Sequence, residues 1–355
     1  MAFDGPRVPL YSPEFAADPH HAYREMRNRY GSLAPVELAP GVPATLVVGY
    51  DTALRILNDP ERFPADPRTW QKNIPADCPV LPIMEWRPTA SRNSGVEFLR
   101  YRQAITASIS EVDLYALHTT VEEIAIPLVN TFCQAGTADL ISQYAFPLTF
   151  EVVNALLGCP AEIGQRVATG MAALVEAVEA ENGNKMISEA DAGTGGPQTN
   201  TLLLILTDDR FGESVLGGTL STRDALDEVL FNDPPLANFL TTYPRQPILI
   251  DDVWLPAHQP ILISMAGCNN DPAIRTEDHT GNRSHLAWGV GPHACPAQSL
   301  AYLVAQYAIV QLLDALPEMR PAIPAGAPTW RPGPFHRALA TLPVTFPPSA
   351  PLHLY

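Results

Sequence analysis

Basic side chains are scarce in this sequence. It has 22 Lys and Arg against 38 Asp and Glu, which gives a formal net charge of -16 at pH 7. A chain that binds phosphates through Coulomb attraction needs a surplus of positive charge. The balance therefore argues against nucleic acid as a partner and against electrostatic docking on an anionic membrane.

Long apolar runs and paired cysteines are lacking as well. No stretch approaches the ~20 apolar residues that cross a bilayer, and the first residues have neither the basic nor the apolar region of an export signal. The five cysteines contain no Cys-x-x-Cys pair, which is typical of reduced thiols. These absences predict a soluble, cytoplasmic protein.

No Gly/Ser-rich linker or charge run divides the chain. The 355 residues would allow two domains, and one large helical domain is equally allowed. A hydrophobic content of 46% supports a substantial core, and 37 prolines favour helices joined by long, proline-punctuated connections.

The stretch from His285 to Ala301 carries the strongest chemical signal. Gly289 and Gly291 are spaced for a tight turn that lets the backbone approach a flat ligand. Apolar residues after Cys295 recur near the helical period, and Pro296 suits the first helical position. Cys295 would then lie at or beside the N-cap, where the helix dipole stabilises the thiolate that a haem iron requires. The alternative is a buried structural cysteine.

The run Trp-Gly-x-Gly-x-His-x-Cys that ends at Cys295 resembles the haem-binding loop of the cytochrome P-450 superfamily, usually Phe-Gly-x-Gly-x-His-x-Cys-x-Gly. Trp288 stands in place of the Phe, and Ala297 in place of the last Gly. The resemblance implies that Cys295 is the proximal ligand of a haem b iron and that His293 bonds a haem propionate. It assigns further haem contacts to Ala287, Trp288, Gly289, Pro296 and Ala301.

A second stretch, from Ser94 to Ala104, predicts a helix and resembles the family's Gly-x-Glu-His-x-x-x-Arg. In the family the His and the Arg both reach haem propionates. Arg102 keeps its place and is implied as a propionate contact, whereas Phe98 replaces the His. A solvated surface arginine is the alternative. The arginine of a further family contact aligns near Thr242, with Arg245 as the candidate substitute.

The resemblance places the family's distal helix around residues 193–204, where the pattern Ala/Gly-Gly-x-Asp/Glu-Thr delivers protons during catalysis. If Gly195 begins the glycine pair, Gln198 replaces the acid and Thr199 keeps the alcohol. An alignment anchored on Asn200 puts glycine and proline at those positions instead. Neither alignment supplies a carboxylate. Thr199 is the candidate catalytic residue, and a loop without function is the alternative.

The segment from Asp227 to Pro235 resembles the family's Glu-x-x-Arg helix with its following Asp-Pro-Pro. Glu228 is in place, but Phe231 replaces the arginine of the buried ion pair. Because a buried pair can be exchanged for apolar packing, the fold does not require it. Glu228 must then find another partner or lie in water.

Periodicity and turn residues predict the other elements. Helices are expected over residues 19–30, 51–58 with Asp51 as cap, 112–135 and 138–158, and a strand over 46–50. Residues 64–94 read either as a surface loop or, by the resemblance, as the region that covers the distal haem pocket and contacts substrate. Residues 248–265 read as a hairpin that turns at Pro256-Ala257, and 335–346 as the family's closing hairpin. The segments 160–196 and 272–285 are short relative to the family.

The resemblance spans nearly the whole chain and implies a mainly α fold. We expect a single P-450-like domain over residues 1–355, with small β-sheets flanking the helices and a central haem. The implied activity is a monooxygenase that oxidises a small to mid-sized hydrophobic substrate with O2. Electrons would come from a separate ferredoxin and ferredoxin reductase, because the chain has no flavin or iron–sulfur segment. The alternatives are a haem-binding partner or regulatory protein with little turnover, and peroxide-driven oxidation.

Overall fold

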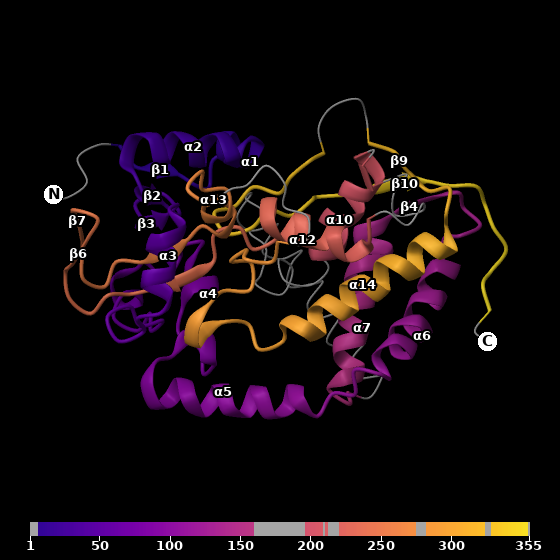
Figure 1. Ribbon diagram of the computed structural model, residues 1–355, viewed down its shortest axis with the longest axis horizontal. Coiled ribbons are helices and arrows are strands. Elements are labelled where there is room, and N and C mark those ends of the chain that lie inside the picture. Colours follow the sequence, from indigo (N-terminus) through magenta and orange to yellow (C-terminus); the bar gives the residue numbers. More distant parts are fainter. Residues whose placement is uncertain are drawn as a thin grey trace. The chain divides into compact units, whose positions relative to one another are not determined.

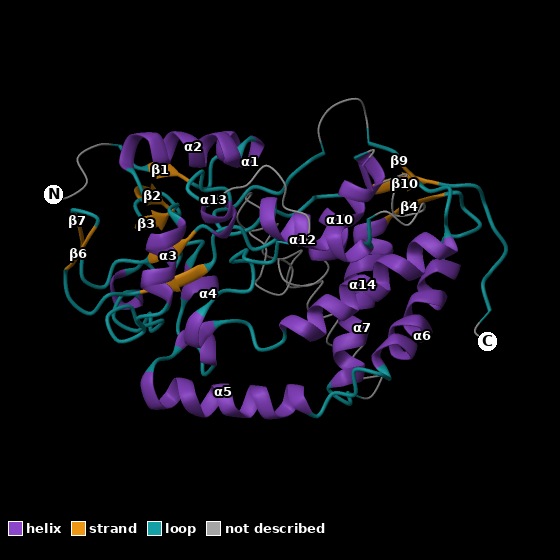
Figure 2. Ribbon diagram, in the orientation of Figure 1, coloured by secondary structure: helices purple, strands orange, loops and turns teal. Residues whose placement is uncertain are grey.

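The computed structural model describes residues 6–159, 196–208, 210–211, 220–274, 282–323 and 328–353. Within them helices predominate and three small sheets accompany them, as the sequence predicts (Figures 1 and 2). Contacts divide the chain into unit 1 (Met1–Glu111, Leu236–Pro296, Pro332–His336) and unit 2 (Val112–Pro235, Ala297–Arg331, Arg337–Tyr355). The single domain over residues 1–355 stays a prediction.

The main sheet of unit 1 has the strand order β1-β2-β3-β8-β5. Its strands are β1 (Val8–Pro9), β2 (Leu33–Glu37), β3 (Pro43–Val47), β5 (Leu240–Thr242) and β8 (Ile261–Ile263). β2 and β3 form an antiparallel hairpin, β3 pairs in parallel with β8, and β8 pairs antiparallel with β5. All of β8 is buried, as an uninterrupted apolar run predicts for a central strand.

Unit 1 also contains helices. They are α1 (Pro13–Ala17), α2 (Pro19–Tyr30), α3 (Tyr50–Leu57), α4 (Leu81–Met84), α5 (Gly95–Ser110) and α13 (Met265–Asn269), with 3-10 turns η1 (Gln71–Asn73), η2 (Ala90–Arg92) and η4 (Gly291–His293). The predicted helix over residues 19–30 is confirmed as α2, which runs beside β2 (Figure 1). The stretch 64–94 is more ordered than a loop, because it contains η1, α4 and η2.

The start of α3 corrects the predicted cap. Gly49 is the N-cap residue, and Asp51 lies in the first turn without capping it. The carboxylate of Asp271 accepts a hydrogen bond from the backbone N–H of Tyr50 at 3.0 Å. A residue distant in sequence thus satisfies one of the free N–H groups that every helix start presents.

A second small sheet in unit 1 corrects the predicted hairpin. β6 (Ile248–Ile250) and β7 (Val253–Leu255) turn at Asp251 and Asp252, with φ of 46° and 62°, and not at Pro256-Ala257. The carboxylate of Asp251 accepts hydrogen bonds from Ser32, Thr52 and Arg55. Although burial opposes the shift, these bonds lower the pKa of Asp251. They stabilise the turn at a place where the sequence has no glycine to mark a left-handed backbone conformation.

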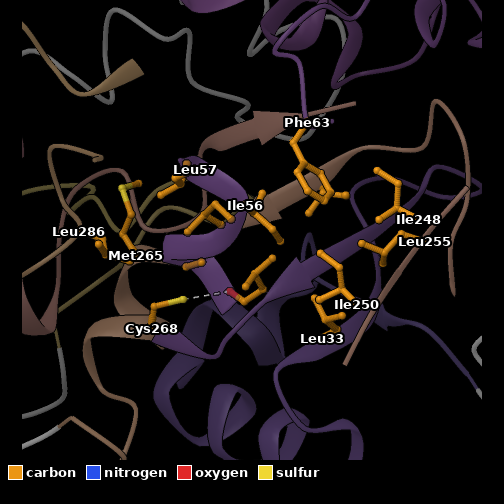
Figure 3. Close-up of a cluster of buried hydrophobic side chains, with 14 residues drawn as sticks. Leu33, Ile56, Leu57, Phe63, Ile248, Ile250, Leu255, Met265, Cys268 and Leu286 are labelled. Atoms are coloured by element: carbon orange, nitrogen blue, oxygen red, sulfur yellow. Dashed lines mark hydrogen bonds between the residues drawn. The ribbon is translucent and has the colours of Figure 1, made fainter. Parts of the chain in front are cut away.

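An apolar cluster between α3, β8 and α13 forms part of the core of unit 1 (Figure 3). Ile56, Ile263 and Met265 are each at most 1% exposed. Cys268 lies at its edge and donates to the carbonyl of Val47 at 3.3 Å, the dashed line in Figure 3. Burial raises the pKa of Cys268, so this thiol is structural.

Unit 2 contains α6 (Leu117–Asn130), α7 (Phe146–Leu156), α10 (Gly196–Thr207), α12 (Thr222–Asn232) and α14 (Gln298–Ala315). Its sheet has the order β4-β10-β9, with β4 (Thr137–Asp139), β9 (Arg320–Pro321) and β10 (Pro343–Thr345). Figure 1 shows α6 and α14 side by side, in agreement with their many contacts. In the part of the chain described, no helix has both the length and the apolarity to span a membrane.

The two long helices predicted over residues 112–135 and 138–158 are wrong in extent. α6 covers only Leu117–Asn130 of the first segment, and β4 begins directly after Gly136, whose φ is 72°. β4 pairs with β10, and Asp139 accepts a hydrogen bond from the backbone of Leu342 at 2.7 Å. A π-helical turn, Ile141–Ala145, then leads into α7. Long-range strand pairing has overridden the helical periodicity. The expected closing hairpin is reduced to β10 and one bridge between Trp330 and Leu339.

Candidate functional site

The loop before Cys295 closes on itself. The backbone N–H of Gly289 donates to Leu286 at 2.8 Å, and that of Cys295 donates to Trp288 at 2.7 Å. Gly289 and Gly291 have φ of 68° and 70°, which other residues rarely adopt. A Cβ on Gly291 would lie 2.7 Å from the carbonyl oxygen of Leu57. The predicted tight turn is confirmed, and the approach of its backbone to a flat ligand stays a prediction.

The position of Cys295 relative to the following helix differs from the prediction. α14 begins at Gln298 with Ala297 as its N-cap, so Pro296 is not the first helical residue. Cys295 lies two residues before the cap, and the loop holds it through the bond to Trp288. Because dipole effects fade beyond the first turn, the helix contributes less to a thiolate here than we expected.

Arg102 connects α5 to this loop. Its Nη1 donates to the carbonyl oxygen of Ala294, one residue before Cys295, at 2.5 Å. The side chain is half-buried, so Arg102 is not merely a solvated surface residue. The contact positions a guanidinium beside the cysteine loop.

Phe98 and His293 pack against each other at the same place. Their ring centroids are 4.2 Å apart at an angle of 40°. Burial, together with the nearby charge of Arg102, lowers the pKa of His293 to about 4. The imidazole is therefore neutral at pH 7, with one nitrogen as donor and the other as acceptor. Phe98, where the family has a His, contributes an aromatic surface and no hydrogen bond.

His293 also lines a cavity of about 70 Å³ within unit 1. Its walls are Ile56, Leu57, Pro60, Phe63, Ala65, Ser91, Arg92, Phe239, Leu240, Thr241, Thr242 and His293. Thr242 is 7% exposed, and among the described residues its hydroxyl has no hydrogen-bond partner. A buried hydroxyl of this kind suits a polar ligand group. Arg245, the candidate substitute at this position, is instead exposed, and its charge acts on Asp66.

Arg92, at the end of η2, is a site residue that the sequence did not indicate. It is 5% exposed and lines the same cavity. Its Nη2 donates to Ile83 at 2.5 Å, and its guanidinium lies 5.2 Å from the centroid of Phe239. No motif or periodicity marks it, because only the fold brings Arg92 into one cavity wall with the distant residues 239–242.

In unit 2, α10 presents a row of buried polar residues. Gln198, Thr199 and Asn200 are each 3–4% exposed. Gln198 donates to the hydroxyl of Thr149 at 3.2 Å, and Asn200 donates to the carbonyl of Arg337 at 2.8 Å. The helix carries no carboxylate, as both alignments predicted. The start of the first alignment, at residues 193–195, lies outside the described residues, so the choice between the alignments stays open.

Glu228 on α12 has found other partners, as the loss of the family's arginine requires. Its Oε1 accepts a hydrogen bond from Asn232 at 2.8 Å and lies 3.9 Å from Nη2 of Arg210. Phe231 is 1% exposed and belongs to the apolar core of unit 2. Apolar packing therefore replaces the ion pair.

The residues present fit a haem. A cysteine follows a glycine-opened loop, and the thiolate is a soft ligand suited to haem iron. The buried hydroxyl of Thr242 and the half-buried imidazole of His293, with the guanidinium of Arg102 close to the loop, suit its carboxylates. Together with the mainly helical fold they define the class of haem-thiolate proteins.

No family model matches the chain. It is similar to the cytochrome P-450 monooxygenase PikC of Streptomyces venezuelae, 26% identical over 395 positions that cover 93% of this chain and 92% of that protein. It is also similar to the 6-deoxyerythronolide B hydroxylase of Saccharopolyspora erythraea, 25% identical over 399 positions covering 94% and 98%. Among solved structures, the testosterone-bound CYP154C4 of Streptomyces sp. ATCC 11861 superposes with a TM-score of 0.80 at 22% identity, covering 97% and 99%. CYP154A1 of Streptomyces coelicolor A3(2) gives 0.77 at 20% identity, covering 93% and 98%.

The chain has the P-450 fold, and the relatives that it resembles in sequence are bacterial cytochrome P-450 enzymes. It is accordingly a haem-thiolate oxidoreductase of the monooxygenase type. Both sequence alignments are longer than its 355 residues, so they contain positions at which only the relative has a residue. Of the segments that are short relative to the family, 160–196 and 272–285, residues 160–195 and 275–281 lie outside the described residues.

Proposed function

We propose that this monooxygenase oxidises a small to mid-sized hydrophobic substrate with O2 and electrons from a separate ferredoxin and its reductase. The observation that carries the proposal is the cysteine loop, opened by two left-handed glycines and bonded to Arg102 of α5. We further propose the cytoplasm as its location, because all five cysteines are free thiols.

Several residues of the loop and of its neighbouring helices have a proposed role. Cys295 holds the iron of haem b through its thiolate, and His293 and Arg102 donate to the propionates. Ala287, Trp288, Gly289, Pro296 and Ala301 supply further contacts with the macrocycle. The bound haem supplies the oxygen chemistry, and the protein contributes binding, orientation and electrostatics. The bond from Arg102 to Ala294 keeps the loop in place for this task.

Thr199 is the proposed proton-donating alcohol. It is 4% exposed on α10, next to Gln198, which takes the place of the family's acid in one alignment. A glutamine can hold a hydrogen bond but cannot ionise, so proton delivery relies on Thr199 and on water. We expect slower turnover than in relatives that have the acid.

The altered motifs support a second candidate, a haem-binding partner or regulatory protein with little turnover. Coupling between electron consumption and product separates the two. Haem-loaded protein is supplied with NADPH, a surrogate ferredoxin and its reductase, and a panel that includes testosterone, vitamin D3 and 6-deoxyerythronolide B, which occur in the names of the relatives. Substrate-dependent NADPH consumption with oxidised product supports the monooxygenase. Stable haem with no coupled product across the panel contradicts it and favours the partner.

In a third arm of the same experiment, hydrogen peroxide replaces O2, NADPH and the ferredoxin system. A peroxide-driven enzyme receives the protons and electrons of O2 reduction with its oxidant, and therefore depends less on the missing acid. If hydrogen peroxide yields product and the ferredoxin system does not, the proposed electron source is wrong. The variant Thr199→Ala should slow the ferredoxin-driven reaction more than the peroxide-driven one.

A further inference from the structure

A proline-rich segment of unit 2 follows strand β10. We call residues 346–352 the proline strap; they include Pro347, Pro348 and Pro351. Proline fixes its own φ near about −65° and restricts the residue before it to extended conformations. The strap is therefore an extended segment by composition alone.

Every third residue of the strap is turned toward the protein. Phe346 is 6% exposed, Ser349 and Leu352 are half-buried, and the residues between them are exposed. A polyproline II helix has about three residues per turn, so positions i, i+3 and i+6 lie on one face. The burial pattern thus fits a strap that presents one face to unit 2.

The backbone of this face bonds to the turn that follows α6. The N–H of Phe346 donates to the carbonyl of Gly136 at 3.0 Å, and the N–H of Ser349 donates to the carbonyl of Cys133 at 3.0 Å. Figure 1 shows the strap, in yellow, on the α6 side of unit 2. The strap therefore supplies hydrogen-bond donors to carbonyl groups between α6 and β4.

The side chain of Asn130, the last residue of α6, pairs with both backbone groups of Leu352. Its Oδ1 accepts from the N–H of Leu352 at 2.7 Å, and its Nδ2 donates to the carbonyl at 3.0 Å. These two bonds resemble those that a neighbouring strand would make. Because they use only backbone groups of the strap, they place no demand on the side chain of Leu352.

Gly136 leaves room for the strap, and Phe346 anchors its first residue. A Cβ on Gly136 would lie 3.2 Å from the carbonyl oxygen of Phe346 and 3.3 Å from Cγ of Pro348. The ring centroid of Phe346 is 6.0 Å from that of Phe132, which is 2% exposed. The part of the strap after Phe346 has no such apolar anchor, since its prolines are exposed.

We propose that Asn130, Cys133 and Gly136 form a recognition groove for an extended proline-rich segment, and that residues 347–352 are an exchangeable ligand of this groove. A separate segment with the same spacing would make the same backbone bonds, and its prolines would reduce the entropy lost on binding. It must compete with the tethered strap, whose effective concentration is on the order of mM. This inference is independent of haem binding.

Alkylation of Cys133 by iodoacetamide measures the opening of the groove. Its thiol lies 4.0 Å from Oδ1 of Asn130, and the residue is 0% exposed. The double variant Ser349→Pro with Leu352→Pro removes the two N–H groups that close the groove. In the full-length protein it should speed alkylation of Cys133 about ten-fold or more, as followed by mass spectrometry. Cys268, also 0% exposed but in unit 1, is the internal control and should keep its rate.

A synthetic peptide then tests exchange in the double variant. The acetylated peptide of residues 347–353, Pro-Pro-Ser-Ala-Pro-Leu-His, should slow alkylation of Cys133 at concentrations on the order of 1 mM. A peptide with proline at the places of Ser349 and Leu352 is the matched control and should give no protection, because it lacks the donating N–H groups. Adding Asn130→Ala should raise the peptide concentration needed about ten-fold or more, since both bonds to Leu352 are lost.

Four outcomes overturn the proposal. Equal alkylation of Cys133 in parent and double variant would show that the two N–H groups do not close the groove. Absence of protection by the strap peptide would show that the strap is an integral part of unit 2. Equal protection by the control peptide would show that backbone donors are not recognised. A parent dimer in size-exclusion chromatography that the double variant lacks would assign the groove to the strap of a second copy.

A second measurement covers a failure of the double variant to fold. Equal acceleration at Cys133 and Cys268 would reveal such a loss of structure. Hydrogen exchange of the unmodified full-length protein then decides. Excess strap peptide should speed exchange at the N–H groups of Ser349 and Leu352, because it displaces the tethered strap. Exchange that stays unchanged would refute an exchangeable strap.

Discussion

At the scale of single residues, three arginines of unit 1 brace the backbone through its carbonyl groups. Arg27 donates to Val48 at 2.8 Å and to Gly267 at 2.5 Å. Arg92 donates to Ile83, and Arg102 donates to Ala294. A charged donor strengthens such bonds, so each arginine ties its own element to a second segment of the chain. The loop next to Cys295 depends on Arg102 in this way.

Replacing Arg102 should weaken haem retention. Arg102→Ala removes the bond to Ala294 and the proposed propionate contact, and a charge-assisted bond contributes about 1.5–3 kcal/mol. For a half-buried side chain we expect the lower value, which corresponds to roughly ten-fold faster haem transfer to apomyoglobin. Arg100→Ala, an exposed arginine on the same helix, is the control. Transfer rates that match the parent would place Arg102 outside the haem site.

Because His285 is buried, the stability of the protein should fall as the pH falls. The side chain is 6% exposed, and burial lowers its pKa from 6.5 to about 4. The unfolded chain therefore binds the proton first as the pH falls. The contribution of the neutral His285 to the free energy of unfolding is fully present above pH 6.5 and is lost progressively between about pH 6.5 and 4. The loss reaches up to about 3 kcal/mol.

Urea unfolding at pH 7.5, 6.5, 5.5 and 4.5 measures this effect, with His285→Gln as the comparison. The parent should lose more stability than the variant across that range. Carboxylates with lowered pKa, such as Asp251, affect both proteins alike. Parallel curves for the two proteins would show that His285 is accessible to protons in the folded state.

At the scale of elements, helix existence was predictable from sequence and helix limits were not. The spacing of apolar residues and Pro19 predicted α2 correctly, because the residue that caps this helix, Asp18, is adjacent in sequence. The predicted limits of α6 and α7 were wrong because Thr137–Asp139 pairs with a strand some 200 residues later. The predicted position of the hairpin turn was wrong for the same reason, since Ser32 and Thr52, both distant in sequence, donate hydrogen bonds to Asp251. Local propensity does not include these distant partners.

The helix α12 gives a prediction for the exchanged ion pair. Phe231 is 1% exposed, and Glu228 already bonds to Asn232. Removing a buried ring costs ~3–5 kcal/mol, and an unpaired buried cation adds to that loss. Phe231→Arg should therefore lower the thermal midpoint and the fraction of protein that holds haem. Phe231→Leu, which stays apolar, should lower the midpoint less.

The competing outcome is informative. If the new arginine reaches Glu228, the ion pair of the relatives is restored, and the midpoint would equal or exceed that of the parent. Calorimetry of the haem-loaded proteins distinguishes the two results. A restored pair would mean that the apolar packing around Phe231 adapts easily to a charge.

At the scale of the whole molecule, one loop of the sequence was enough to indicate the fold and the chemistry. Its glycines, His293 and Cys295 are adjacent in sequence, so their pattern is visible without structure. Arg92 was missed because its cavity is assembled from segments around residues 60, 92, 240 and 293. The boundaries of the two compact units depend on contacts alone, and no linker composition marks them in the sequence.

The central claim is that Cys295 supplies a thiolate to a haem iron, and the spectrum of the reduced carbon monoxide complex tests it most directly. In the parent we predict the red-shifted Soret band of a thiolate-ligated haem. Cys295→Ser should lose that band, because a serine hydroxyl is a harder donor and ionises far less readily. Cys159→Ser, at a half-buried cysteine like Cys295, should keep it. A red-shifted band that persists unchanged in Cys295→Ser would contradict the account.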